Sequence, residues 1–220
     1  MESVLRVFEN IDWIAVILGS SLLILVLCKF FFYNRFISFV SLPFNNKYIF
    51  IYGKKDILFN WFNFLWSLFL GLNLSLFIFY FLDKFITANT NYVILTYFTI
   101  LGLLALFYVL KIVLQLVNGY VFNSEVIIEQ YIFKKISYLN YSGLILFFAN
   151  ILQTYVVPKG TIILSIALIL ILVVNIIGWV NLFKNHRNFL ANNFFYFILY
   201  LCALEISPLV IIVNYLKFNV

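Results

Sequence analysis

The sequence predicts an all-α polytopic membrane protein, a bundle of about six transmembrane helices with no soluble domain. Of its 220 residues, 65% are hydrophobic and 10% are charged, whereas soluble domains carry about 25% charged residues. A chain of this length could not hide so much apolar surface from water, but a lipid bilayer accepts it. The apolar residues also gather in runs of roughly 20, the length that a spanning helix needs. We therefore expect a single transmembrane domain over residues 1–220.

Polar stretches divide the chain into successive apolar runs. The first run has acidic residues before it and no small-residue cleavage site after it, so we expect a retained span and not a signal peptide. The long stretch 34–59 is interpreted as an aqueous loop that lies partly at the interface, where its Phe and Tyr residues fit. The fourth run is the least hydrophobic, because several Asn, Ser and Gln residues interrupt it. The predicted spans cover about residues 12–33, 60–82, 92–118, 136–156, 161–183 and 189–216.

The net charge of +6 is spread over the ends of the apolar runs. It forms no basic stripe, so nucleic acid is not an expected partner. Cytoplasmic loops of membrane proteins carry an excess of Lys and Arg. The first, third and fifth loops with their helix ends hold ten such residues: Lys29, Arg35, Lys47, Lys54, Lys55, Lys111, Lys134, Lys135, Lys184 and Arg187. The opposite side holds four: Arg6, Lys84, Lys159 and Lys217. We therefore expect an inner-membrane protein with both termini in the periplasm.

Signatures of catalysis and of metal binding are not found in the sequence. Cys28 and Cys202 lie inside apolar runs, and the one histidine, His186, lies in a short basic loop. None of these positions has the spacing of a metal site. The sequence also contains no G-x-S-x-G, H-E-x-x-H, Walker A or G-x-G-x-x-G motif. We expect no metal, no cofactor and no enzymatic activity.

Glu205 lies well inside the last predicted span and is followed by Pro208. A charged side chain near the bilayer centre costs roughly 2.5–3.5 kcal/mol on insertion scales, so this glutamate must face the interior of the bundle, find a partner or stay protonated. It could be a proton or cation site. It could instead be a structural group that binds backbone atoms freed by the kink at Pro208. The sequence leaves both interpretations open.

Three further polar residues lie within the predicted spans. Lys111 either snorkels to the headgroups or reaches toward Glu205, although the difference in depth disfavours direct pairing. Asn73 and Asn150 each lie about 14 residues, or roughly 21 Å, from the cytoplasmic start of their spans. At that shared depth they could form one polar layer with Glu205, or they could simply hold neighbouring helices together.

The last predicted span also carries a family resemblance. Within residues 194–209, the residues Tyr200, Leu201, Cys202, Glu205 and Pro208 match a C-terminal signature. This segment resembles that of a family of multi-pass inner-membrane proteins of Bacteroidota with a domain of unknown function. The resemblance implies a membrane location and a taxon. Since that phylum has a type IX secretion and gliding motility apparatus, it also suggests membership in envelope machinery.

Two functional hypotheses follow from these observations. The first is a non-enzymatic subunit or accessory factor of an inner-membrane assembly, whose partners would be the lipid bilayer and other membrane protein subunits. The second is a small transporter or proton-linked channel that uses Glu205. The sequence leaves the oligomeric state open.

Overall fold

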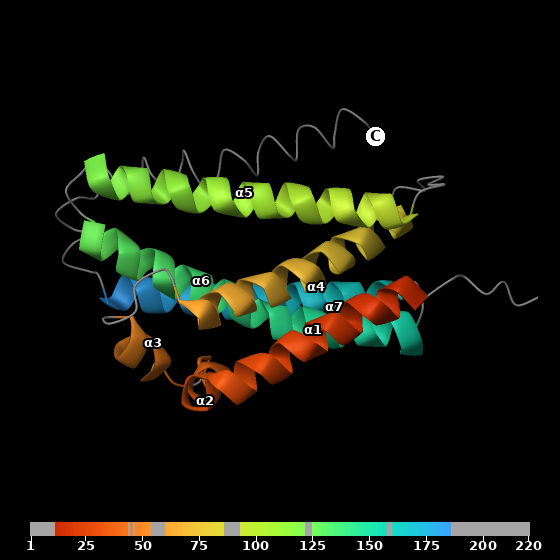
Figure 1. The fold of residues 1–220 in the computed structure, drawn as a ribbon, viewed down its shortest axis with the longest axis horizontal. Helices are drawn as coiled ribbons and strands as arrows, with labels where there is room; N and C mark the ends of the chain where they lie inside the picture. The colour runs from red at the N-terminus through yellow and green to blue at the C-terminus, as the bar shows by residue number, and fades with distance from the viewer. Residues whose placement is uncertain are drawn as a thin grey trace, which may run out of the picture. The chain divides into compact units, whose positions relative to one another are not determined.

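The described part of the protein is helical throughout. The computed structural model describes residues 12–43, 45, 47–53, 60–85, 93–121, 125–157 and 160–185. The chain divides into two units, Met1–Gly178 and Trp179–Val220, and every contact given below lies within the first unit. The helices are α1 (Asp12–Phe31), α2 (Tyr33–Val40), α3 (Lys47–Tyr52), α4 (Trp61–Phe85), α5 (Val93–Val121), α6 (Glu125–Ile151) with its π-helical continuation η1 (Leu152–Val156), and α7 (Thr161–Asn185) (Figure 1).

The predicted all-α fold is confirmed for these residues, and four of their helices are long and apolar enough to cross a membrane. These helices are α1, α4, α5 and α7, and their bounds follow the first, second, third and fifth predicted spans closely. The last predicted span, 189–216, lies outside the described residues.

The fourth predicted span differs from the helix that contains it. The helix α6 begins at Glu125 and not at Ile136, and it is absent from the four described helices that could span by composition. The additional turns contain Glu129, Lys134 and Lys135. Glu and Lys are good helix formers, so charged residues can end a span without ending the helix.

The predicted loop 34–59 is also more ordered than expected, since it contains α2 and α3. The helix α2 follows α1 after Phe32, a residue with φ −131° and ψ 46°. These angles are not helical, so the chain changes direction and α2 leaves the line of α1 (Figure 1). Phe36 and Phe39 of α2 then pack against Trp66 of α4.

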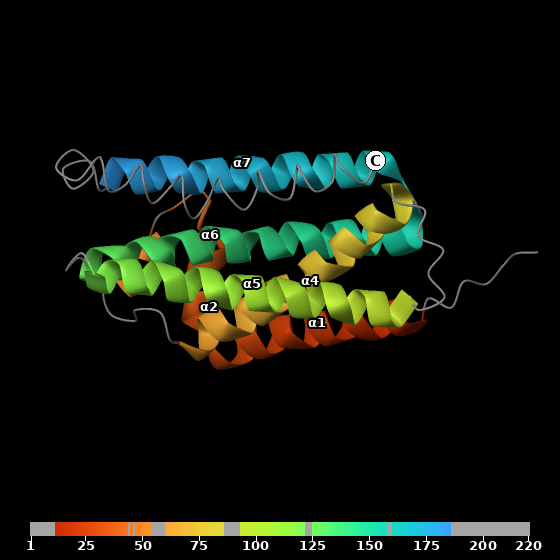
Figure 2. The ribbon, with the colours of Figure 1, turned by 90° about the horizontal axis from the view of Figure 1, so that it is seen from above.

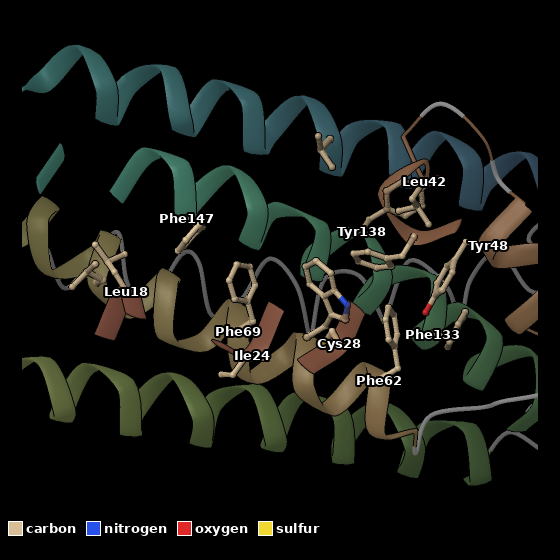
Figure 3. Packing of buried hydrophobic residues seen from close by; sticks show 14 of the residues in the cluster. Leu18, Ile24, Cys28, Leu42, Tyr48, Phe62, Phe69, Phe133, Tyr138 and Phe147 are labelled. Carbon is tan, nitrogen blue, oxygen red and sulfur yellow. The ribbon is translucent and has the colours of Figure 1, made fainter. Parts of the chain in front are cut away.

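The helix α4 lies between α1, α5 and α6 and packs against all three. Figure 2 shows α4 crossing the bundle at an angle to α5 and α6. Aromatic residues fill much of the buried core around it. Figure 3 shows Tyr48, Phe62 and Phe133 gathered toward one end of this core, with Leu18 and Phe147 toward the other.

Two glycines allow α6 to approach its neighbours closely. A Cβ atom on Gly143 of α6 would lie 3.3 Å from the Leu70 Cα atom of α4 and 3.1 Å from the Phe69 ring. A Cβ atom on Gly178 of α7 would lie 2.6 Å from the Tyr138 ring of α6. Small residues at such crossings let membrane helices pack with their backbones close together. Packing of this kind encloses α6 within the first unit.

Candidate functional site

The helix α6 is rich in polar residues and is almost fully enclosed. From residue 129 to residue 151, the one exposed side chain is Phe148. The buried polar side chains on α6 and η1 are Lys134, Ser137, Asn140, Ser142, Asn150, Gln153 and Thr154. A buried polar group is costly unless it is hydrogen-bonded, so the partners of these side chains define what this region can do.

Asn73 of α4 and Asn150 of α6, both predicted as intramembrane polar candidates, lie in direct contact. The Asn150 side-chain Nδ2 atom donates to the backbone oxygen of Asn73 at 2.9 Å and approaches its Oδ1 atom at 3.4 Å. The Asn73 amide in turn donates to the Phe69 oxygen one turn earlier at 2.9 Å. Both side chains are buried. Their contact joins α4 to α6 in the interior of the bundle.

A second pair of side chains extends this contact into the π-helical turn. The hydroxyl groups of Tyr80 and Thr154 lie 2.6 Å apart, and the Thr154 hydroxyl donates to the Asn150 oxygen at 2.7 Å. A π-turn places its residues differently from an α-helix and is frequent at functional sites. Asn73, Asn150, Tyr80 and Thr154 together form what we call the polar cluster.

Further polar contacts occur along α6. Ser67 of α4 lies 3.2 Å from the Tyr108 hydroxyl of α5 and is also in contact with Asn140 of α6. The Asn175 side chain of α7 donates to the Ser142 hydroxyl at 3.1 Å. The Ser67–Asn140 contact joins α4 to α6, the Ser67–Tyr108 contact joins α4 to α5, and the Asn175–Ser142 contact joins α7 to α6. Polar groups therefore link α6 directly to α4 and α7, and they link α4 to α5.

Lys111 lies apart from the polar cluster. It is half-buried on α5, its Nζ atom is 5.9 Å from the Phe107 ring centroid, and it lies within hydrogen-bonding reach of Lys135 on α6. Burial, with the neighbouring Lys111, lowers the pKa of Lys135 to about 7. Burial also lowers the pKa of Lys134. Lys111 thus belongs to a group of basic residues and does not join the layer of Asn73 and Asn150.

The remaining predicted site residues, Glu205 and Pro208, lie outside the described part of the chain. That Glu205 lies in one polar layer with Asn73 and Asn150 therefore remains a prediction. The two asparagines are in contact with each other.

Sequence reasoning missed a cage of aromatic rings around Arg35 of α2. The guanidinium carbon of this buried residue lies 4.5 Å from the Tyr52 ring centroid, 5.4 Å from that of Phe62 and 6.0 Å from that of Tyr48. The Tyr48 hydroxyl donates to the Asn63 Oδ1 atom at 3.1 Å, and burial raises the pKa of Tyr48 to about 12. Arginine stacks favourably on aromatic faces.

A helical spacing in the sequence could have indicated this cage. Residues 32, 35, 36 and 39 recur at the interval that places side chains on one face of a helix. The count of basic residues treats Arg35 only as a loop charge, and hydropathy does not reveal its position on that face.

The chemistry open to the described residues is limited. No three His, Cys, Asp or Glu side chains in this part of the chain are arranged to hold a metal ion. The polar cluster consists of amides and hydroxyls, which are neutral at physiological pH. Such groups hydrogen-bond strongly in an apolar interior, and they fix the positions of the helices that carry them.

Comparison with known proteins places this bundle in a family. The pattern of the domain of unknown function DUF4271 matches residues 14–216. The chain matches no curated protein and no solved structure. Because the match extends over nearly the whole sequence, the chain belongs to the DUF4271 family.

Proposed function

We propose that this protein is a non-enzymatic integral subunit or accessory factor of a membrane protein assembly. The observation that carries the proposal is the contrast between a closed interior and a wide apolar outer surface. Inside, the polar cluster consists of side chains that hydrogen-bond to one another and to the backbone. Outside, α5 exposes the large apolar side chains Leu103, Leu106, Val109, Leu110, Val113 and Val117. Such a surface suits lipid and the helices of other subunits.

The cellular setting is part of the same proposal. The family resemblance and the charge bias favour the inner membrane of Bacteroidota, with about six spans and both termini in the periplasm. The fourth span, about residues 136–156, would lie within the enclosed helix α6 and its continuation η1, which neighbouring helices would shield from lipid. An envelope machine for secretion or gliding is the kind of assembly that this setting suggests. Fusions of a periplasmic reporter to each terminus would test the orientation.

Photo-cross-linking in the native host tests the proposed subunit role. A photoreactive amino acid at Leu103 or Val113 on the outer side of α5 should join the protein to a defined membrane protein. The same group at the buried Phe69 provides the matched control and should give no such product. The cross-linked protein should also co-purify with the unmodified chain in mild detergent. Recovery of a free monomer, without cross-links from either exposed position, would contradict the proposal.

A small transporter or proton-linked channel is the second candidate, and the predicted intramembrane Glu205 favours it. Here Glu205→Gln should abolish function in a deletion strain while the protein still accumulates in the membrane. Glu129→Gln is the control, because Glu129 lies outside the predicted spans and should tolerate the loss of charge. Normal function of the Glu205→Gln variant would rule out this mechanism.

A further inference from the structure

The helices α2 and α3 expose apolar side chains that a surface helix in water would normally bury. On α2 the one charged residue, Arg35, is buried with Phe39, while Tyr33 is 57% and Ile37 51% exposed. Helices at a water surface turn charge outward and apolar residues inward. Arg35 therefore anchors α2 to the protein through the aromatic cage, and the opposite side is left apolar.

The helix α3 also exposes apolar side chains. Tyr48 and Ile49 are buried against the core, while Phe50 is 63% and Ile51 44% exposed. We call the exposed apolar residues of both helices the outer face of α2 and α3. Its members are Tyr33, Ile37, Val40, Phe50 and Ile51.

The position of α2 along the chain places this face near the membrane boundary. The preceding helix α1 has 20 residues, which at 1.5 Å per residue is about the thickness of the hydrocarbon core. Its last turn contains Lys29 and the exposed Phe30 and Phe31, a combination typical of the headgroup level. Because α2 begins two residues later and turns away from α1, it starts at that level.

From these observations we propose that the outer face of α2 and α3 is inserted into the boundary between headgroups and acyl chains of one leaflet. Its partner is a bilayer that contains anionic lipids. Charge complementarity supports that choice, because the exposed Lys29 and Lys47 flank the face and suit anionic headgroups. The exposed Asn34 lies beside the apolar residues of α2, where it can meet headgroups. This arrangement is that of a helix lying in the interface.

Spin labels on the full-length protein can test this insertion. The two cysteines are first replaced by alanine, and single cysteines are then introduced as Ile37→Cys or Phe50→Cys. The protein is reconstituted in vesicles of phosphatidylethanolamine and phosphatidylglycerol. Molecular oxygen, which concentrates in lipid, should relax both labels several-fold more than a water-soluble nickel chelate does. Lipids with a nitroxide near the headgroup should also broaden both signals.

Two control positions make the outcome decisive. A label introduced by Asn45→Cys, at an exposed polar residue between the two helices, should respond more to the nickel chelate. A label introduced by Leu106→Cys on α5 should report lipid, because that residue is exposed on a helix able to span. The proposal fails if the labels at positions 37 and 50 respond as the label at 45 does, or if they are shielded from both reagents. In either case a lipid signal at position 106 would leave the proposed membrane protein intact.

Discussion

The helices α5 and α6 follow one another in the chain and pack together, yet they lie in opposite surroundings. Only 6% of the apolar window within Ile94–Val117 of α5 is buried, whereas almost every described residue of α6 after Glu129 is covered. The exposed helix is apolar, and the covered helix carries the polar side chains. In a membrane protein, polarity on an enclosed helix is balanced by contacts with other helices. The same polar groups on α5 would lie on the exposed apolar surface, and a bilayer around that surface would leave them unsatisfied.

The largest expected effect comes from filling the close approach between α6 and α4. Gly143→Val should lower the free energy of unfolding by about 1–3 kcal/mol, since overpacking forces neighbouring atoms apart. The Leu70 backbone limits how far the structure can yield. The measurement is unfolding by SDS added to mild-detergent micelles, followed by circular dichroism.

Gly102→Val on α5 is the matched control for that change. No atom lies within 4 Å of a Cβ built at Gly102, so this variant should unfold at nearly the SDS concentration of the unmodified protein. Equal destabilisation of the two variants would show that α5 is as enclosed as α6. The difference in surroundings described for the two helices would then be wrong.

The next effect concerns the contact between Asn73 and Asn150. A double-mutant cycle with alanine at each position should give a coupling free energy of about 0.6–1.7 kcal/mol, the range found for polar contacts between membrane helices. Thr99→Ala on α5 should cost less, because the Thr99 hydroxyl bonds only within its own helix, to the Thr96 oxygen. A coupling near zero in the same unfolding assay would mean that the two asparagines act independently.

The described fold could be predicted from the sequence where the helices are long and apolar. Hydropathy located α4, α5 and α7 to within a few residues, because a helix able to cross a bilayer needs a minimum apolar length. It failed at the start of α6, since Lys134 and Lys135 are charged but are covered by protein. It failed again at α2, where the decisive spacing of aromatic residues spans only eight residues.

The candidate site was predictable to a similar degree. Counting residues from the membrane edge places Asn73 and Asn150 at one depth, and the structure brings them together. Tyr80 and Thr154 gave no such signal. Their contact depends on a π-turn, which shifts the helical register in a way that sequence spacing does not reveal.

A smaller effect is expected at that π-turn. Tyr80→Phe removes the hydroxyl that bonds Thr154 and should cost about 0.6 kcal/mol, the average for such contacts in membranes. Tyr155→Phe provides the control within the same turn, because Tyr155 is exposed. Loss of the Tyr155 hydroxyl should leave the unfolding midpoint unchanged. If both variants were equally destabilised, the loss could not be assigned to the hydroxyl pair.

A pH dependence is expected as well, and it involves one residue from each of the two helices, Lys111 of α5 and Lys135 of α6. The pKa of Lys135 falls from 10.5 to about 7 in the folded protein. Between these two values the unfolded chain holds a proton that the folded chain has released, so stability rises with pH. Below about pH 7 both states are protonated at this residue, and its contribution is constant and unfavourable. Lys135→Met should therefore flatten the rise in unfolding free energy above neutral pH.

Lys111→Met separates the two causes of this pKa shift. It removes the neighbouring amine but leaves Lys135 buried, so the slope should decrease without vanishing. The measurement is the SDS unfolding midpoint at several pH values above neutrality, for both variants and the unmodified protein. A slope as steep in Lys135→Met as in the unmodified protein would assign the pH dependence to other groups, with the buried Lys134 as the next residue to test. If Lys111→Met removed the slope completely, the charge on α5 and not the burial of α6 would govern the titration. In that case, the contrast between the exposed α5 and the covered α6 would apply only to their neutral residues.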